Sequence, residues 1–435
     1  MGASSNRFLS PGGWLVWAGF ALALALAPVL LSSGLWLNML SQMGCLIIIC
    51  LSFNMKLGHG GMLSFGHAVY TGLGGFGAVF AIDYVASHDV ALPLVLVPLI
   101  GGVSGALVAI PLGYVSTKKA GTTFAMISLG IGQLVAAFAV MLPGVFGGDA
   151  GLSIDRTYGE PFFGLTFGPQ IEVYGLIAVY CLVCTALMYA FTGTPLGRML
   201  NAVRDNPERV EFIGYNTQRV RWYAFILSGF FAGIGGALTA INFEIVNATD
   251  ALSLVRSGSY LLFTFLGGAT FFFGPIIGGV LMVLASVLLS ELTSAWLLYL
   301  GLVFLLMVMY APGGVASLIM ANVHMARFGK LRRLWGLYGA LLVAAAVALV
   351  GLSMLIEMIY HRQLNAAMGS QVKYLGMQLD TASALAWLGA LAVALVGAGL
   401  LETVRRRFAR AWGQAQEEIA ATLQGRIRQH QETPA

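Results

Sequence analysis

The chain has 435 residues, of which 58% are hydrophobic and only 9% are charged. A soluble globular protein carries about 25% charged residues, so this composition excludes a soluble domain and indicates a polytopic membrane protein. The net charge of +5 comes from arginines in the segments between apolar runs. Such a distribution is a signal of membrane topology and not of nucleic-acid binding.

The first third of the chain contains five apolar runs that can cross a bilayer, since a spanning helix needs about 20 residues. We expect the first run, preceded by Arg7, to be an uncleaved helix because no convincing signal-peptide cleavage site follows it. Lys118 and Lys119 mark the connection before the fifth run as cytoplasmic. The expected spans are residues 14–33, 35–53, 62–82, 90–114 and 121–142.

A glycine-rich segment, G-H-G-G-M-L-S-F-G-H-A, occupies residues 58–68. If it is helical, the spacings of three and four place Ser64, His67 and Thr71 on one face, where they predict a polar strip along a solute path. A histidine in apolar surroundings needs a partner or a wet cavity, so His67 can equally be a structural residue bonded to a neighbouring carbonyl. No metal site is expected, because no second ligand stands beside it.

Residues 143–172 carry four carboxylates against the single Arg156, and we expect them to form an external loop. A span at 173–192 then returns the chain to the cytoplasmic side, where the polar loop 194–221 holds five arginines.

The loop 194–221 contains dense helix signals. Thr194 stands before Pro195 and Asn206 before Pro207, the pattern of an N-cap followed by a first-turn proline. Gly214 can supply the left-handed residue that ends the second helix. We expect two short helices on the membrane surface. They either rest on the lipid headgroups or dock on a partner, and the paired signals favour docking.

Four further spans follow, and the motif around two of them suggests broken or tilted helices. Together with the glycine segment of the first half, this motif hints at an internal repeat around a transport path; close packing through small residues is the alternative. The break is formed by Gly267, Gly268, Gly274 and Pro275, and the expected spans are residues 222–242, 257–273, 275–291 and 295–310.

The segment 321–435 extends the chain with two expected spans, residues 335–356 and 383–401, and a basic tail. Apolar residues of the tail recur at helical spacing, which predicts a surface helix on anionic lipid or on a partner subunit; a solvated, partly disordered tail is the alternative. The fold class is therefore an all-α polytopic membrane protein with about ten core helices and about two C-terminal ones. Both termini are expected in the cytoplasm.

The chain lacks the chemistry of several other classes. It has no phosphate-binding G-x-x-x-x-G-K-[ST] loop, no H-E-x-x-H and no G-x-S-x-G. The core spans hold essentially no midplane carboxylate, which a proton- or sodium-driven carrier usually keeps. These observations favour a permease that is energised by another protein, with a self-sufficient secondary carrier or channel as the alternative. The cysteines all lie in apolar runs, where we expect buried free thiols: Cys45, Cys50, Cys181 and Cys184.

Three motifs in order resemble the LivM-type permeases of branched-chain amino acid ABC importers. They are G-x-L-S-F-G-H-A at 61–68, R-x-x-P-E-R-V-E-x-x-G-Y-N-x-x-R at 204–219 and G-G-A-T-F-F-F-G-P-I-I-G-G at 267–279. The resemblance covers roughly residues 14–320, and we take 1–320 as the permease core. The extension 321–435 departs from the usual end of this family.

The resemblance implies one of two different permease subunits in a bacterial inner membrane, paired with a LivH-like permease. Two cytoplasmic ATPases would bind the ATP, so the chain itself needs no cofactor, and a periplasmic binding protein would deliver the solute. Charged side chains would meet a polar groove on an ATPase, while Phe212 and Ile213 would anchor by burial. The coupling role implied by the resemblance falls on Arg204, Asp205, Asn206, Pro207, Glu208, Arg209, Glu211 and Gly214.

Overall fold

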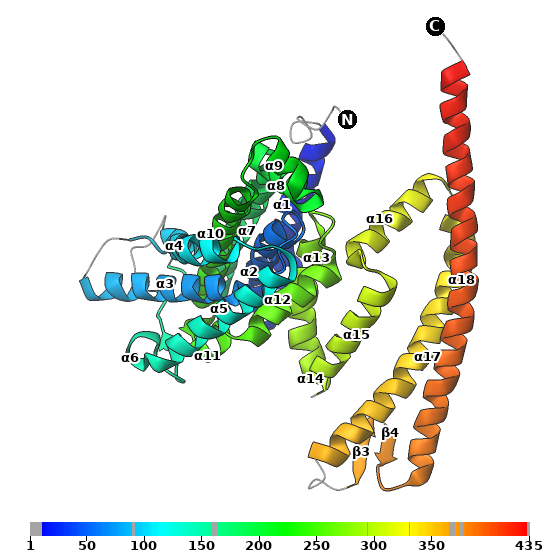
Figure 1. Cartoon of the computed structure of the whole chain (residues 1–435). Helices are drawn as coiled ribbons and strands as arrows, with labels where there is room; N and C mark the ends of the chain where they lie inside the picture. Colours follow the sequence, from blue (N-terminus) through cyan, green and yellow to red (C-terminus); the bar gives the residue numbers. More distant parts are fainter. Residues whose placement is uncertain are drawn as a thin grey trace. The chain divides into compact units, whose positions relative to one another are not determined.

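The computed structural model describes residues 11–88, 92–157, 164, 166–293, 295–329, 331–364, 370–374 and 377–432. The chain divides into two compact units. The first comprises Met1–Leu292 with Leu300–Ser317, and the second comprises Thr293–Tyr299 with Leu318–Ala435. Most of the described residues are helical, which confirms the all-α prediction (Figure 1).

The helices of the first unit follow the predicted spans closely. The short connecting elements are the 3-10 turn Leu94–Leu96, α6 (Pro143–Phe146), β1 (Leu152–Ser153), β2 (Ile245–Val246) and α11 (Ala248–Ala251). The long helices are α1 (Pro11–Leu30), α2 (Gly34–Leu57), α3 (His67–His88), α4 (Val97–Ser116), α5 (Gly121–Met141), α7 (Gln170–Gly193) and α10 (Thr217–Phe243).

The later part of the core is built from shorter pieces. By length and apolarity, eight helices of the described chain can cross a membrane, or nine if the bent pair α15 and α16 counts as one span. Each of the twelve predicted spans contains a helix, but α12 has only 14 residues and α15 only 15, because glycines and prolines interrupt the apolar runs. These pieces are α12 (Leu254–Gly267), α13 (Gly274–Leu284), a π-helical turn (Ala285–Leu289), α14 (Ser290–Leu292), α15 (Trp296–Tyr310) and α16 (Gly314–Arg327).

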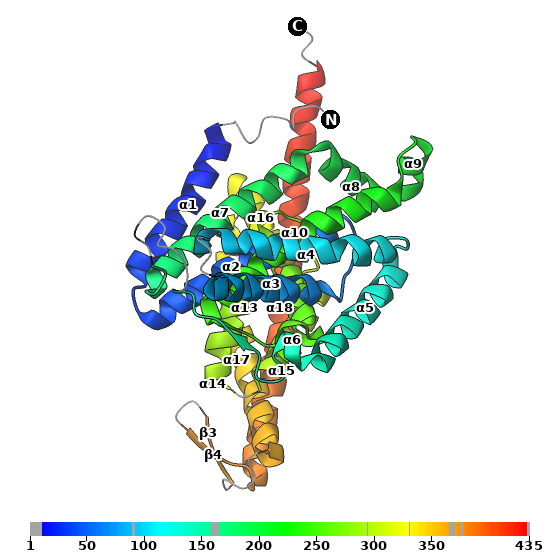
Figure 2. The same ribbon diagram turned by 90° about the vertical axis from the view of Figure 1, so that its left-hand side faces the viewer.

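Glycines allow the three central helices of the core, α3, α4 and α10, to touch backbone to backbone. A Cβ placed on Gly233 of α10 would lie 2.2 Å from the carbonyl oxygen of Gly101 on α4. A Cβ on Gly74 of α3 would lie 2.3 Å from the Cα of Gly233. Such close approach is the usual way in which membrane helices gain van der Waals contact. Figure 2 shows the helices α3 and α4 side by side.

The predicted helix at 62–82 begins later than expected. Gly61 has φ +63°, and residues 61–66 form a non-helical turn before α3 starts at His67. Ser64 therefore does not share a helical face with His67, and that part of the prediction is wrong. His67 and Thr71 do lie on α3, four residues apart.

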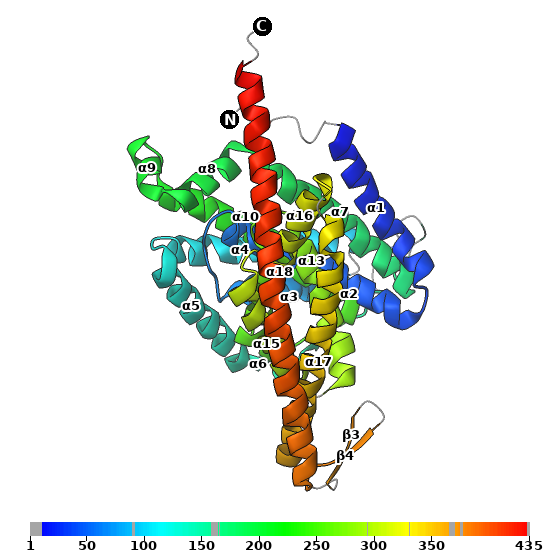
Figure 3. The same cartoon turned by 90° about the vertical axis from the view of Figure 1, so that its right-hand side faces the viewer.

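The second unit is dominated by two long antiparallel helices, α17 (Leu331–Leu364) and α18 (Ala384–Glu432), with the hairpin β3 (Gln371–Tyr374) and β4 (Met377–Asp380) between them in sequence (Figure 3). Glycines again mediate the contact, since a Cβ on Gly351 would lie 2.3 Å from the backbone nitrogen of Ala394.

The tail does not form an element of its own. The last span and the tail are one 49-residue helix, α18, so the helical spacing predicted for the tail is confirmed, and its place on anionic lipid or on a partner subunit stays a prediction. No proline stands between Ala384 and Glu432, so the helix can continue through the junction. Glu402 also forms ion pairs of 2.7 Å with Arg405 and Arg406, three and four residues on.

Candidate functional site

The loop between α7 and α10 forms the two predicted short helices, α8 (Pro195–Asp205) and α9 (Pro207–Phe212). The Thr194 hydroxyl accepts a hydrogen bond from the Gly197 amide at 3.2 Å, and the Asn206 side chain accepts one from the Arg209 amide at 2.9 Å. These two N-caps confirm the local prediction. The chain re-enters the core sooner than expected, since α10 begins at Thr217.

The end of α9 is closed by two interactions. Gly214 has φ +88°, and its amide donates to the Glu211 carbonyl at 2.9 Å, so the left-handed stop is confirmed. The Thr217 hydroxyl donates to the Glu211 carboxylate at 2.7 Å, which ties α9 to the start of α10. Val210 is buried and fixes the inner face of α9. The short helix is thus held from three directions.

The projecting tip of α9 is apolar and exposed. The exposed fractions are 89% for Phe212, 64% for Ile213 and 52% for Tyr215. Glu208 and Arg209 beside them are exposed as well. Exposed clusters of large apolar side chains with a polar rim are typical of surfaces that bind another protein. Figure 2 shows α8 and α9 projecting at one end of the first unit.

The inner side of α8 packs on the glycine turn that precedes α3. The Arg204 guanidinium donates to the Gly58 carbonyl, and the His59 ring contacts the Asn201 side chain at 3.1 Å. Gly61 leaves room for the Arg204 stem, since a Cβ there would lie 2.9 Å from the Arg204 Cγ. Helix α8 is therefore in direct contact with residues 58–61.

The surroundings of His59 favour the neutral form of its ring. Burial, together with the nearby positive charge of Arg204, lowers the pKa of His59 below its ordinary value of 6.5, although the hydrogen bond to Asn201 opposes this shift. A neutral ring can donate from Nδ1 to the Asn201 oxygen, which matches the observed contact.

The two glycine motifs of the sequence meet at the same place. A Cβ on Gly58 would lie 2.4 Å from the carbonyl oxygen of Ala269, in the turn between α12 and α13. That turn is tight, since a Cβ on Gly267 would lie 2.1 Å from the Gly274 carbonyl oxygen, and Pro275 occupies the first turn of α13. Gly268, with φ +114°, completes it. Sequence reasoning did not foresee this meeting, because the motifs lie about 200 residues apart.

The three candidate path residues have different surroundings. His67 is fully buried, and its Nε2 lies 3.1 Å from the Ser52 hydroxyl. Ser64 is also buried, and its hydroxyl has no hydrogen-bond partner among the described residues. Thr71 lines a cavity of about 290 Å³ together with residues of α10, α11 and α12. The structure does not bring the three onto one surface.

A buried lysine at the end of α2 was not singled out from the sequence. Lys56 is fully buried, and its ammonium group lies 4.8 Å from the centre of the Tyr70 ring and 4.5 Å from that of Phe225. Such cation–π contacts partly replace lost hydration. The available signal was a charged residue at the end of an apolar run.

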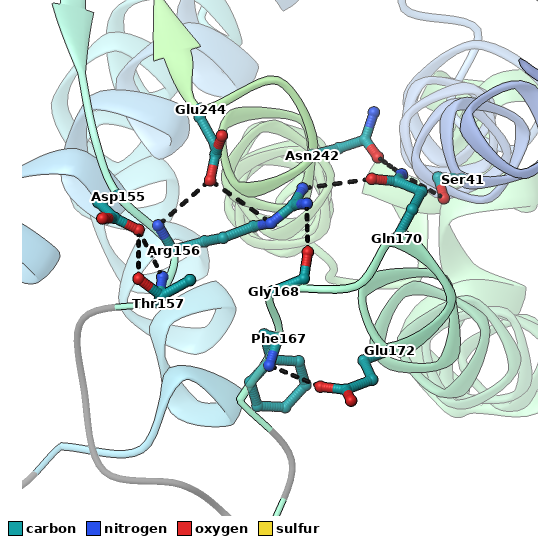
Figure 4. Close-up of polar contacts among 10 residues, drawn as sticks. All are labelled: Ser41, Asp155, Arg156, Thr157, Phe167, Gly168, Gln170, Glu172, Asn242 and Glu244. Carbon is teal, nitrogen blue, oxygen red and sulfur yellow. Dashed lines mark hydrogen bonds and ion pairs between the residues drawn. The ribbon is translucent and has the colours of Figure 1, made fainter. Parts of the chain in front are cut away.

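The opposite end of the core is held by a network of polar side chains (Figure 4). The Arg156 guanidinium contacts the Glu244 carboxylate at 3.4 Å, the Gly168 carbonyl at 2.9 Å and the Gln170 side chain at 3.3 Å. Gln170 in turn donates to Asn242 at 2.8 Å. The network therefore joins the loop 152–169 to α7 and α10.

Charged side chains lie at both ends of the core. Lys118 stacks on Tyr114 near the start of α10, and Arg204 lies at the glycine turn. The carboxylates of Glu172, Glu244 and Asp250 lie at or near the other ends of these helices.

Fold and site together define a multi-pass, all-helical membrane protein with a loop of two capped short helices at one end of the first unit. The chain belongs to the family of branched-chain amino acid transport system permease components, whose model matches residues 35–312. It is thus a LivM-type permease of the ABC transporter class, a transport subunit and not an enzyme.

Individual relatives agree with this assignment. The chain is 26% identical over 291 residues to the high-affinity branched-chain amino acid permease LivM of Escherichia coli, covering 62% of this chain and 67% of that protein. It is 27% identical over 292 residues to LivM of Salmonella typhimurium, with the same coverage. A probable LivH of Methanocaldococcus jannaschii is 29% identical over 161 residues, which cover 36% of this chain and 49% of that one. No solved structure matches.

Proposed function

We propose that this chain is one of two membrane subunits of an ATP-driven importer and forms half of the path for a branched-chain amino acid or related solute. A LivH-like permease pairs with it, a periplasmic binding protein delivers the solute, and two cytoplasmic ATPases dock on α8 and α9. The protein lies in the inner membrane of a bacterium with both termini in the cytoplasm. Residues 1–320 form the working core, and 321–435 form an extension.

The observation that carries this proposal is the exposed apolar tip on a rigidly capped helix. Phe212 and Ile213 are free to be buried against a partner, and a few buried anchors of this kind together carry most of an interface's affinity. Because α9 is capped at both ends, a force applied at its tip moves the helix as a body. The movement of α9 is then transmitted to the core through the contact of Arg204 with the glycine turn.

The contact at the glycine turn suggests how ATP binding by the partners reaches the path. Displacement of α8 pulls on Gly58, which is continuous with the turn that leads to His67 and α3. The same turn touches Ala269, so the hairpin of α12 and α13 shifts with it. A solute path between these helices can therefore open alternately to the two sides.

A self-sufficient carrier fits the chain less well. Carboxylates in the spans α2 to α10 stand at helix ends, as Asp83 and Glu172 do. A carrier driven by protons or sodium usually keeps such a group near the membrane midplane.

The proposal is tested by replacing Phe212 and Ile213 together with serine and measuring pull-down of the ATPases and ATP-driven leucine uptake in proteoliposomes. Loss of two anchors should weaken ATPase binding by at least about 30-fold, the equivalent of about 2 kcal/mol. Charge reversal by Glu208→Arg or Arg209→Glu should weaken it less.

A matched control is serine replacement of Leu142 and Val145, which are exposed apolar residues at the opposite end of the core. These variants should bind the ATPases normally. If the serine pair at Phe212 and Ile213 leaves both binding and uptake at the wild-type level, the loop is not the coupling element. Uptake that follows an ion gradient without ATP would favour the self-sufficient carrier.

A further inference from the structure

A cavity opens on the end of the core that lies away from α8 and α9. It has a volume of about 290 Å³, the size range of a small solute. Helices α3, α10, α11 and α12 and the strand β2 form its walls. The lining residues used below are Thr71, Gly75, Ala240, Val246, Asp250, Ala251, Arg256 and Tyr260.

Two opposite charges stand together in the cavity lining. Asp250 lies in α11 and Arg256 in the first turn of α12, and their side chains form an ion pair. The Ser253 side chain caps α12 by accepting from the Arg256 amide at 3.0 Å, which fixes the direction in which the arginine leaves the helix. The interruption between α11 and α12 at Ser253 therefore brings the side chains of Asp250 and Arg256 together.

The ion pair is accessible to a ligand. The exposed fractions of the two side chains are 63% for Asp250 and 38% for Arg256. An exposed pair contributes little to stability, so a ligand that supplies a new partner to each charge can separate them at little cost. The ligand must bring both charges, because otherwise one side chain would be left without its partner.

The other lining residues give the cavity a polar part and an apolar part. Thr71 and Tyr260 add hydroxyl groups, and both are nearly buried. Ala240, Val246 and Ala251 add an apolar wall.

The space between these walls depends on a glycine. A Cβ on Gly75 would lie 3.3 Å from the Gly236 carbonyl oxygen and 3.5 Å from the Val246 side chain, so the absence of a side chain there helps to leave the cavity open.

We propose that this cavity binds a free apolar α-amino acid on its way through the permease, with Arg256 receiving the carboxylate and Asp250 the ammonium group. The apolar side chain of the ligand lies against Ala240, Val246 and Ala251. This assignment rests on the proposed import function and adds to it the residues that recognise the solute. A guanidinium group binds a carboxylate through two parallel hydrogen bonds, which also fixes the ligand's orientation.

The wall of the cavity is held by the network at this end of the core. Glu244, which pairs with Arg156, directly precedes β2, and Val246 of β2 pairs with Leu152 of β1. A recognition site needs such support, because a lining that moves by an ångström loses its selectivity. Thr71 stands one helical turn after His67, so the cavity is also continuous with the helix that the glycine turn moves.

The test uses cysteine labelling in the full transporter complex in nanodiscs, with leucine as the probe. The four native cysteines are buried, so a cysteine introduced by Ala251→Cys is the accessible thiol. Thr249→Cys, two residues away and exposed but outside the cavity lining, is the matched control. Each is labelled with a small water-soluble thiol reagent with and without leucine.

Leucine should slow labelling of Ala251→Cys and leave that of Thr249→Cys unchanged. Adding Arg256→Gln or Asp250→Asn should raise the leucine concentration needed for protection by at least about tenfold, the loss expected when a charged partner is removed. Leucinamide lacks the carboxylate and 4-methylpentanoate lacks the ammonium group. Arg256→Gln should abolish the preference for leucine over the amide, and Asp250→Asn the preference over the acid, which a purely structural ion pair would not do.

The outcomes separate this inference from the proposed function. Normal ATP-driven leucine uptake without any protection of Ala251→Cys would overturn the binding site and leave the function standing. Protection that persists in both charge variants would overturn the role of the ion pair. Protection without uptake would support the site and contradict the import function.

Discussion

The two ends of the core differ in how their polar side chains are paired. At the end of Arg156, polar side chains satisfy one another, and Glu244, Gln170 and Asn242 all have partners. At the end of α8 and α9, large apolar side chains are exposed, while His59 Nε2 and the Ser64 hydroxyl have no hydrogen-bond partner among the described residues.

This difference separates stability from function. A network in which every group is paired stabilises one arrangement of the helices. Exposed apolar groups and unpaired polar atoms cost stability, and such features persist where a partner or a second conformation uses them. We therefore expect substitutions at the Arg156 end to act on unfolding and substitutions at the α9 end to act on partner binding.

The largest effect on stability is expected from Arg156→Met. The change removes the guanidinium group from three acceptors while keeping much of the side chain's volume, and it should lower the free energy of unfolding by about 2 kcal/mol. The thermal midpoint of the detergent-solubilised protein measures it. Asp155→Asn is the control, because Asp155 bonds only its neighbour Thr157 in the described structure. An equal loss in both variants would contradict the role of the network.

The substitution Gly214→Val is expected to have a smaller effect, on ATPase binding and not on thermal stability. The left-handed backbone at Gly214 costs about 1–2 kcal/mol with a β-branched side chain, although the space around it is open. The tip should lose its orientation, and ATPase binding should fall about tenfold with little change in thermal midpoint. Gly193→Val is the control, since Gly193 also has open space but no positive φ. Equal loss of binding in both would mean that backbone strain is not the cause.

The smallest effect is the change with pH in the stability that His59 contributes at the contact between α8 and the glycine turn. Because the pKa of His59 is lower in the folded than in the unfolded chain, its contribution to stability is complete above 6.5 and declines as the pH falls below that value. The difference in thermal midpoint between wild type and His59→Asn should therefore shrink from about pH 7.5 to about pH 5.5. A difference that grows on acidification would show that the ring is charged in the folded state.

Local features of this chain could be predicted from the sequence, and contacts between distant segments could not. The caps at Thr194 and Asn206 and the stop at Gly214 depend on neighbours within four residues, so composition and order suffice. The start of α3 at His67 was missed because the left-handed Gly61 and the packing of α8 decide it.

The candidate site shows the same limit. Residues 204–214 were recognised as a unit, but the contact of Arg204 with Gly58 depends on how α8 folds back over the core. Likewise, the pairing of Arg156 with Glu244 joins residues 88 positions apart. A lone arginine in an acidic loop was the only signal, and it did not identify the partner.

The unbroken course of α18 has a mechanical consequence. A helix of 49 residues is roughly 74 Å long, whereas the hydrocarbon layer is about 30 Å thick. If the helix crosses the bilayer, roughly 40 Å of its length extends beyond the hydrocarbon layer. The cluster of arginines after Glu402 then lies where the helix leaves the lipid. Whatever attaches to its far end is kept at a set distance from the membrane surface.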